Sequence, residues 1–195
     1  MKTKIILLAC YFIIQYSGLS AQVVYTNENF NSGVPSSWMV STPTCFNLSG
    51  DTTKWEGTVN GWRNQGLGGF SLDSSEFVIV DSDRPSLFCQ CNEFLTTPVI
   101  NATASTTLFL EFDQYFRYYN GGYGEIGEVQ VFDGVTWVLL TSFISTSGTW
   151  NAPYHQVLNL TPYINANMQI RFRYEANWDW FWAIDNLRIA ETIIT

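Results

Sequence analysis

Two carboxylates, Glu111 and Asp113, lie two residues apart in the middle of the chain. In a β-strand this spacing puts both side chains on one face of the sheet. Retaining glycoside hydrolases use a pair of carboxylates as acid and nucleophile, and Glu125 and Glu128 follow close behind in the sequence. The same spacing is also typical of the solvent-exposed face of a strand. Hydrolysis of a glycan is therefore one hypothesis, and an ordinary exposed strand face is its alternative.

A second group of acidic residues has the chemistry of a calcium site. Asp81 and Asp83 follow an apolar run, and Asp185 interrupts an alternating apolar row in the closing segment of the chain. Calcium takes about six to eight oxygen ligands, which carboxylates and loop carbonyls supply. We expect Asp185 to face the core, where a carboxylate needs a metal, an arginine or backbone donors as its partner. The alternative is that Asp185 faces solvent at a bulge and that the Asp81 pair belongs to a turn.

Aromatic side chains offer a third kind of chemistry, stacking on a ligand. Tyr118, Tyr119 and Tyr123 surround the pair Gly121 and Gly122, which argues against a regular strand there. Exposed aromatic rings in a loop present flat surfaces on which a sugar ring can stack. We therefore predict a ligand-binding patch at these three tyrosines. The alternative is that many of the aromatic residues pack in the core.

Nucleophilic catalysis has little support. His155 is the single histidine of the chain, and no Gly-x-Ser-x-Gly segment accompanies it. We interpret His155 as a surface residue on a strand.

Composition defines the class of protein. The 195 residues are 46% apolar, 16% aromatic and 13% charged, which is typical of a globular chain. The formal net charge is −8, so a nucleic-acid partner is not expected, because phosphate binding needs a basic face.

The first residues have the pattern of an export signal. Lys2 and Lys4 precede the ten-residue apolar run 5–14, and small and polar residues follow up to Ala21. A membrane-spanning helix needs about 20 apolar residues, so no transmembrane segment is expected. We predict a signal peptide over residues 1–21, a single domain over 22–195, and a secreted or cell-surface location.

Three cysteines remain after the signal peptide: Cys45, Cys89 and Cys91. Disulfides persist outside the cell. A bridge between Cys89 and Cys91 would be strained, because a single residue separates them in the chain. We expect Cys45 to pair with one of these two residues.

Alternation of apolar and polar residues predicts β-strands through much of the chain, including 108–113, 128–131, 168–175 and 181–190. Asp133 and Gly134 predict a hairpin turn between two of them. No stretch has a convincing helical period. An antiparallel sandwich of two sheets gives each alternating strand one buried face and one solvated face.

The order of motifs along the chain resembles a known family. It begins with residues 28–33 (ENFNSG), followed by Pro35 and Trp38, and continues with 77–83 (FVIVDSD), 95–100 (LTTPVI), 108–112 (LFLEF) and 182–189 (WAIDNLRI). This set resembles the cleaved-adhesin or choice-of-anchor J domains of secreted bacterial surface proteins and, more distantly, the MAM domains of extracellular receptors. The likeness spans about residues 26–190.

The resemblance implies an all-β, two-sheet antiparallel jelly-roll sandwich that binds a ligand and is not an enzyme. It also implies a calcium ion near the joined first and last strands, with Asn31 and Asp185 at the matching positions. Asn31 departs from the acidic residue of the family pattern, which would weaken such a site. Family members usually accompany a partner enzyme or an anchoring domain.

Together these observations predict an exported adhesion module that recognises a carbohydrate or a host or matrix protein. The expected ligand-binding residues are Tyr118, Tyr119 and Tyr123. The expected calcium ligands are Asn31, Asp81, Asp83 and Asp185. A β-sandwich glycoside hydrolase and a structural accessory domain of a larger secreted enzyme are the alternatives.

Overall fold

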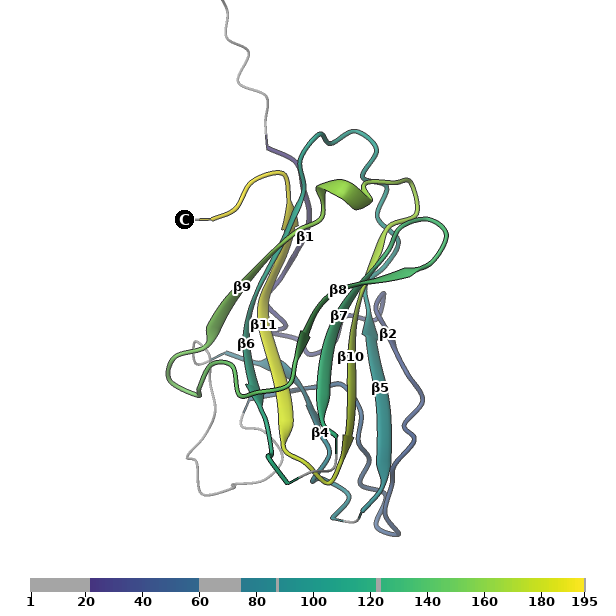
Figure 1. Cartoon of the computed structure of the whole chain (residues 1–195), viewed down its shortest axis with the longest axis vertical. Coiled ribbons are helices and arrows are strands. Elements are labelled where there is room, and N and C mark those ends of the chain that lie inside the picture. Colours follow the sequence, from purple (N-terminus) through teal and green to yellow (C-terminus); the bar gives the residue numbers. More distant parts are fainter. Residues whose placement is uncertain (1–21, 60–74, 87, 122–123, 195) are drawn as a thin grey trace, which may run out of the picture.

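The structure is a computed structural model that describes residues 22–59, 75–86, 88–121 and 124–194. Two antiparallel β-sheets pack face to face in it (Figure 1). The predicted signal peptide, residues 1–21, and Tyr123 lie outside the described residues. The two sheets confirm the all-β jelly-roll sandwich expected from the sequence.

The first sheet has six strands. Its order is β3 (Glu56–Thr58), β4 (Phe77–Asp81), β11 (Phe181–Ala190), β6 (Phe109–Arg117) and β9 (Tyr154–Asn159), and β1 (Val24–Glu28) also pairs with β11. The central position of β11, the last strand, brings the two ends of the domain together.

The second sheet has five strands. Its order is β2 (Met39–Val40), β5 (Gln90–Thr96), β10 (Gln169–Asn177), β7 (Ile126–Phe132) and β8 (Trp137–Phe143). The predicted hairpin joins β7 to β8, with the amide of Asp133 donating to the carbonyl of Thr136 at 3.1 Å. The helical structure in the described part of the chain is one short 3₁₀ turn, Thr161–Tyr163, and no helix there is long and apolar enough to span a membrane.

The core between the sheets follows the predicted alternation. Leu108, Leu110 and Phe112 of one row are fully buried, and Trp182 packs edge-to-face against Phe172 of the opposite sheet with ring centroids 5.7 Å apart. Burying one such side chain contributes about 1.5 to 3 kcal/mol. The outward-facing row of β6, which includes Glu111 and Asp113, is thereby fixed on the outer face of the six-stranded sheet.

A β-bulge in β11 corrects the expectation for Asp185. Asp185 pairs with Asp113 and Arg188 with Glu111, so two residues of β11 oppose one residue of β6. The extra residue reverses the alternation: Ala183 belongs to a cluster on the outer face, whereas Leu187 belongs to the main core. Asp185 therefore does not interrupt a core-facing row. It is buried on the outer side of the sheet, where the amide of Asn186 donates to it at 2.8 Å.

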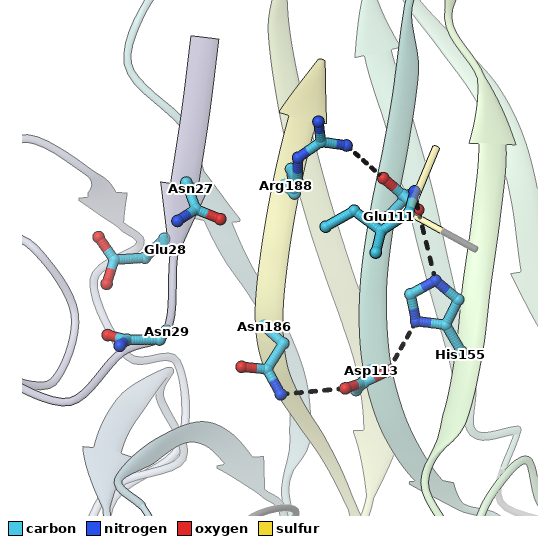
Figure 2. A pocket seen from close by; sticks show the side chains of 9 residues that line it. Asn27, Glu28, Asn29, Glu111, Asp113, His155, Asn186 and Arg188 are labelled. Carbon is cyan, nitrogen blue, oxygen red and sulfur yellow. Dashed lines mark hydrogen bonds and ion pairs between the residues drawn. The ribbon is translucent and has the colours of Figure 1, made fainter. Parts of the chain in front are cut away.

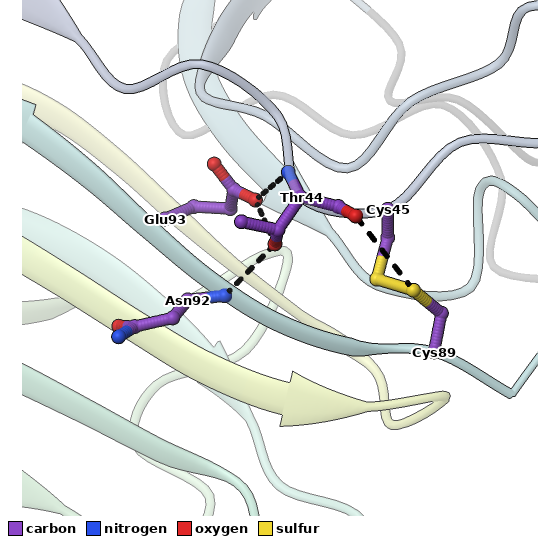
Figure 3. Close-up of a disulfide and its surroundings, with 5 residues drawn as sticks. All are labelled: Thr44, Cys45, Cys89, Asn92 and Glu93. Atoms are coloured by element: carbon purple, nitrogen blue, oxygen red, sulfur yellow. Dashed lines mark hydrogen bonds between the residues drawn. A yellow bond between two sulfur atoms is a disulfide. The ribbon is translucent and has the colours of Figure 1, made fainter.

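A disulfide joins Cys45 to Cys89, as one of the two pairings expected (Figure 3). It ties the loop after β2 to the start of β5. The same loop is held by the buried carboxylate of Glu93, which accepts hydrogen bonds from the Thr44 amide at 2.9 Å and from the Ser41 hydroxyl at 2.7 Å. Cys91 remains a free thiol, and burial raises its pKa to about 12, so it is unreactive.

Candidate binding site

A polar pocket lies on the outer face of the six-stranded sheet (Figure 2). Its cavity volume is about 430 Å³, within the range of small-ligand sites. Side chains from β1, β6, β9 and β11 meet there, with one residue of the C-terminal segment. The lining residues are Asn27, Glu28, Asn29, Glu111, Asp113, His155, Asn186, Arg188 and Ile194.

Strand register brings the charged groups of the pocket together. Asp113 of β6 pairs with His155 of β9, and Glu111 pairs with Arg188 of β11. Residues paired across neighbouring strands share one face of the sheet, so these four side chains project to the same side. The bulge adds Asn186, whose φ of 50° is a left-handed conformation that asparagine tolerates better than most residues.

Glu111 is the buried centre of this network. Its side chain is 2% exposed and accepts hydrogen bonds from Arg188 Nη1 at 2.7 Å and from the Ile194 amide at 2.8 Å. The His155 Nε2 atom lies 3.6 Å from a Glu111 oxygen. A carboxylate buried in this way is stable because its charge is paired and hydrogen-bonded.

Asp113 links the network to the exposed part of the pocket. It accepts from Asn186 Nδ2 at 3.0 Å and lies 2.8 Å from His155 Nδ1. His155 is 48% exposed, so solvent and ligands can reach this side of the network. Within the described part of the chain the Asn27 side chain and the Asn186 Oδ1 atom make no hydrogen bond. These groups can donate to and accept from an incoming ligand.

The predicted tyrosine patch is divided in the structure. Tyr119 is 43% exposed, with its ring centroid 6.2 Å from that of Trp180. Tyr118 is half-buried and packs against the main core. Two further rings are exposed that are not among the predicted binding residues: Phe88, 59% exposed, and Trp178, 39% exposed.

A buried carboxyl group lies beneath the Tyr119 loop. Glu125 is 2% exposed and accepts hydrogen bonds from the Tyr119 amide at 2.7 Å and from the Tyr174 hydroxyl at 2.8 Å. Burial is the main reason why its pKa is raised to about 8, with a smaller contribution from Asp179 and Asp83. The two hydrogen bonds act in the opposite direction and keep the shift smaller than burial alone would make it.

The four residues expected to bind calcium do not converge on one point. Asp81 pairs with Phe181, four residues along β11 from Asp185, which corresponds to about 13 Å of strand. Asn31 follows β1, which ends opposite Leu187 and so belongs to the Asp185 end of the sheet. In the described ranges no group of three or more His, Cys, Asp or Glu side chains is placed to hold a metal. The set as predicted does not fit a single ion, and calcium binding by other donors stays a prediction.

Comparison with known proteins shows which solved structures share this fold. A scan of family models and a search of curated proteins found no match. Among solved structures, the K1 cleaved adhesin domain of Lys-gingipain from Porphyromonas gingivalis W83 is similar with a TM-score of 0.59 and 16% identity, over 86% of this chain and 98% of that one. The fold is the same. The resemblance predicted from the sequence is confirmed at this level.

Two further structures share this fold. The K3 cleaved adhesin domain of the same protein matches with a TM-score of 0.57 and 18% identity, over 86% of this chain and 98% of that one. TmCBM61, solved in complex with β-1,4-galactotriose, matches with a TM-score of 0.52 and 14% identity, over 87% of this chain and 99% of that one.

Proposed function

We propose that this chain is an exported, non-catalytic binding module that recognises a neutral glycan in the pocket formed by β1, β6, β9 and β11. The observation that carries the proposal is the lining of that pocket, which contains both hydrogen-bond donors and acceptors. Hydrogen bonds between the lining side chains fix their positions before a ligand binds. Adhesion to a glycan-bearing surface is the biological role that follows. The adhesin domains and TmCBM61, which was solved with a bound galactotriose, support this proposal by their shared fold.

Sugar hydroxyls suit this lining because each hydroxyl can donate one hydrogen bond and accept others. The amides of Asn27 and Asn186 offer both kinds of group, and Asp113 and His155 add an acceptor and a ring nitrogen. The ion pair between Glu111 and Arg188 fixes the floor of the pocket, so little side-chain freedom is lost when a ligand binds.

Charge favours a neutral ligand over an acidic one. Three carboxylates, Glu28, Glu111 and Asp113, line the pocket against one arginine, Arg188, and the whole chain has a formal net charge of −8. A uronic acid or a sulfated sugar would add a like charge to this site, which costs binding free energy.

The hydrogen bonds of the two candidate catalytic carboxylates, Glu111 and Asp113, favour binding without turnover. A glycosidase needs one carboxyl group that donates a proton to the leaving group. In this pocket both Glu111 and Asp113 accept hydrogen bonds from neighbouring side chains, and Glu111 is ion-paired with Arg188. This use of both groups as acceptors favours binding without turnover.

The experiment is to measure affinity of residues 22–195 for β-1,4-galactan, xylan and polygalacturonate by affinity electrophoresis and calorimetry. We expect binding to a neutral polymer, none to polygalacturonate, and no release of reducing sugar. His155→Ala and Asn27→Ala should each lower affinity about tenfold. Leu139→Ala, on the other sheet and 52% exposed, is the matched control and should bind as the wild type does.

Three results would contradict the proposal. Turnover lost on Glu111→Gln without unfolding would establish the hydrolase alternative. Equal affinity of His155→Ala and wild type would place the ligand elsewhere on the molecule. No binding to any glycan in a wider array would favour the accessory-domain alternative.

A further inference from the structure

The loops at one end of the sandwich carry two pairs of aromatic side chains that the pocket does not use. The turn between β10 and β11 contributes Trp178 and Trp180. Each ring meets a ring from another loop: Trp178 meets Phe88 with centroids 4.2 Å apart, and Trp180 meets Tyr119 with centroids 6.2 Å apart. Both contacts are edge-to-face. We call these four residues the aromatic rim.

The rim is exposed although its members are large and apolar. Phe88, Tyr119 and Trp178 are 59%, 43% and 39% exposed. Arg117 lies under the Trp180 ring, with its guanidinium carbon 3.5 Å from the ring centroid, and holds that ring in place. Exposed aromatic groups that are fixed in this way are typical of binding surfaces, because they lose little entropy on binding.

The backbone at Trp178 is strained. Its φ is 54°, a left-handed conformation that a bulky side chain rarely adopts. Glycine would occupy this position without strain. Residues that keep such a conformation against their preference cluster at ligand-binding positions. Tryptophan at this position therefore lowers the stability of the fold. We infer that it is retained because its ring is exposed for binding.

The charges around the rim select the kind of partner. Asp83 is acidic, and its neighbour Ser82 donates through its backbone amide to the Trp180 carbonyl. Glu175 is also acidic; it accepts from Gln90 and is ion-paired with Arg173. The nearby basic groups of the described residues are all engaged: Arg117 is covered by the Trp180 ring, Arg84 is ion-paired with Glu56, and Arg173 is ion-paired with Glu175. An anionic lipid surface attracts clustered Lys and Arg, so this arrangement does not suit a membrane. Carboxylates beside aromatic faces suit a sugar, whose C–H bonds meet the ring face and whose hydroxyls donate to the acids.

We propose that the aromatic rim is a second glycan-binding surface, separate from the pocket, on which the flat faces of sugar rings in a neutral polysaccharide stack against Trp178, Phe88 and Tyr119. It rests on the proposed function in one respect, that the ligand of this chain is a neutral glycan. Stacking needs a run of sugar rings, so the rim should contribute to binding of a polymer and little to binding of a trisaccharide.

The test compares two single variants, Trp178→Gly and His155→Ala, against β-1,4-galactan and β-1,4-galactotriose. We expect Trp178→Gly to bind the polymer at least fivefold more weakly and the trisaccharide as the wild type does, while His155→Ala loses affinity for both. Because glycine relieves the strained backbone, Trp178→Gly should also melt at a higher temperature than the wild type. Phe88→Ala should repeat the loss of polymer affinity without this gain.

Each result separates the two proposals. Wild-type affinity of Trp178→Gly and Phe88→Ala for the polymer, together with loss in His155→Ala, would overturn the rim and leave the pocket. Loss in the rim variants alone would confirm the rim and overturn the pocket. No glycan binding by the wild type would overturn both, and binding of the wild type to phosphatidylcholine vesicles that Trp178→Gly abolishes would make the rim a lipid-binding surface instead.

Discussion

At the scale of single residues, the buried carboxyl group of Glu125 couples the Tyr119 loop to the interior. Its two oxygens accept from the Tyr119 amide and the Tyr174 hydroxyl, and no cationic side chain of the described residues pairs with it. Burial raises its pKa to about 8 from an ordinary 4.5. The folded protein therefore holds a proton that the unfolded chain releases at lower pH.

This linkage predicts a loss of stability with rising pH. The free energy of unfolding should fall as pH increases from about 4.5 to about 8, because in that interval the folded state binds more protons than the unfolded state, and it should level off above 8. Relative to Glu125→Gln, the wild type should lose on the order of a few kcal/mol across the interval. Denaturant unfolding at a series of pH values measures this difference.

The control for this prediction is Glu175→Gln, which removes a carboxylate that is about one-third exposed. Its stability should follow the wild type through the same pH range. Parallel curves for the wild type and Glu125→Gln would show that the Glu125 carboxyl group titrates normally.

At the scale of elements, the bulge in β11 determines the geometry of the pocket and could not be predicted from the alternation. The alternating row from Phe181 to Ile189 looks continuous in sequence. Because of one extra residue at Asn186, its first residues face the outer side of the sheet and its last residues face the core. Bulges leave no fixed sequence signal when the residue is not glycine. The sequence did place Glu111 and Asp113 on one strand face, whereas their meeting with His155 and Arg188 depends on pairing between distant strands.

Two substitutions of Asn186 distinguish the role of its left-handed backbone from the role of its side-chain amide. Asn186→Gly keeps the left-handed backbone but removes the amide that donates to Asp113, so stability should change little while glycan affinity falls several-fold. Asn186→Ala removes the same contact and adds strain, which should cost about 1 kcal/mol of stability as well. Thermal melting together with calorimetric titration distinguishes these outcomes. Equal glycan affinity of all three proteins would mean that Asn186 does not contact the ligand.

The disulfide between Cys45 and Cys89 also stabilises the arrangement of the elements. It closes a segment with a sequence separation of 44 between Cys45 and Cys89, so its loss should lower the free energy of unfolding by about 2 to 4 kcal/mol. Melting with and without reductant measures the effect. The double variant Cys45→Ala/Cys89→Ala should melt lower than the wild type and should not respond to reductant. An unchanged melting temperature on reduction would show that the loop is held by the Glu93 hydrogen bonds alone.

At the scale of the whole molecule, the fold was predictable and the sites were predictable in part. Period-two alternation, the Asp133-Gly134 turn and the order of motifs predicted the jelly roll, because these signals are local. The pocket joins residues as far apart as Asn27 and Arg188, and the aromatic rim joins Phe88 to Trp178. Such meetings depend on the sheet order, which local patterns do not contain. The distance between two of the predicted calcium ligands has the same origin, since Asp81 and Asp185 share a sheet but not a position along it.

The carboxylates of the pocket have protein groups as partners. Glu111 and Asp113 are partnered by Arg188, His155, Asn186 and a backbone amide, and Glu28 accepts from the Phe30 amide. Glycan affinity should therefore be the same in calcium and in EDTA. Lower affinity in EDTA, restored by calcium, would show that oxygen donors outside the predicted set hold an ion that the binding surface needs.

The most direct test of the central claim is to map the bound glycan on residues 22–195 by NMR titration of ¹⁵N-labelled protein with the neutral oligosaccharide that binds best. The pocket predicts that the side-chain amides of Asn27 and Asn186 and the backbone amides of Asp113 and His155 shift with one common dissociation constant. A His155→Ala sample should lose these shifts while keeping the rest of its spectrum. Shifts confined to other surfaces, with these four residues unmoved at saturation, would contradict the claim.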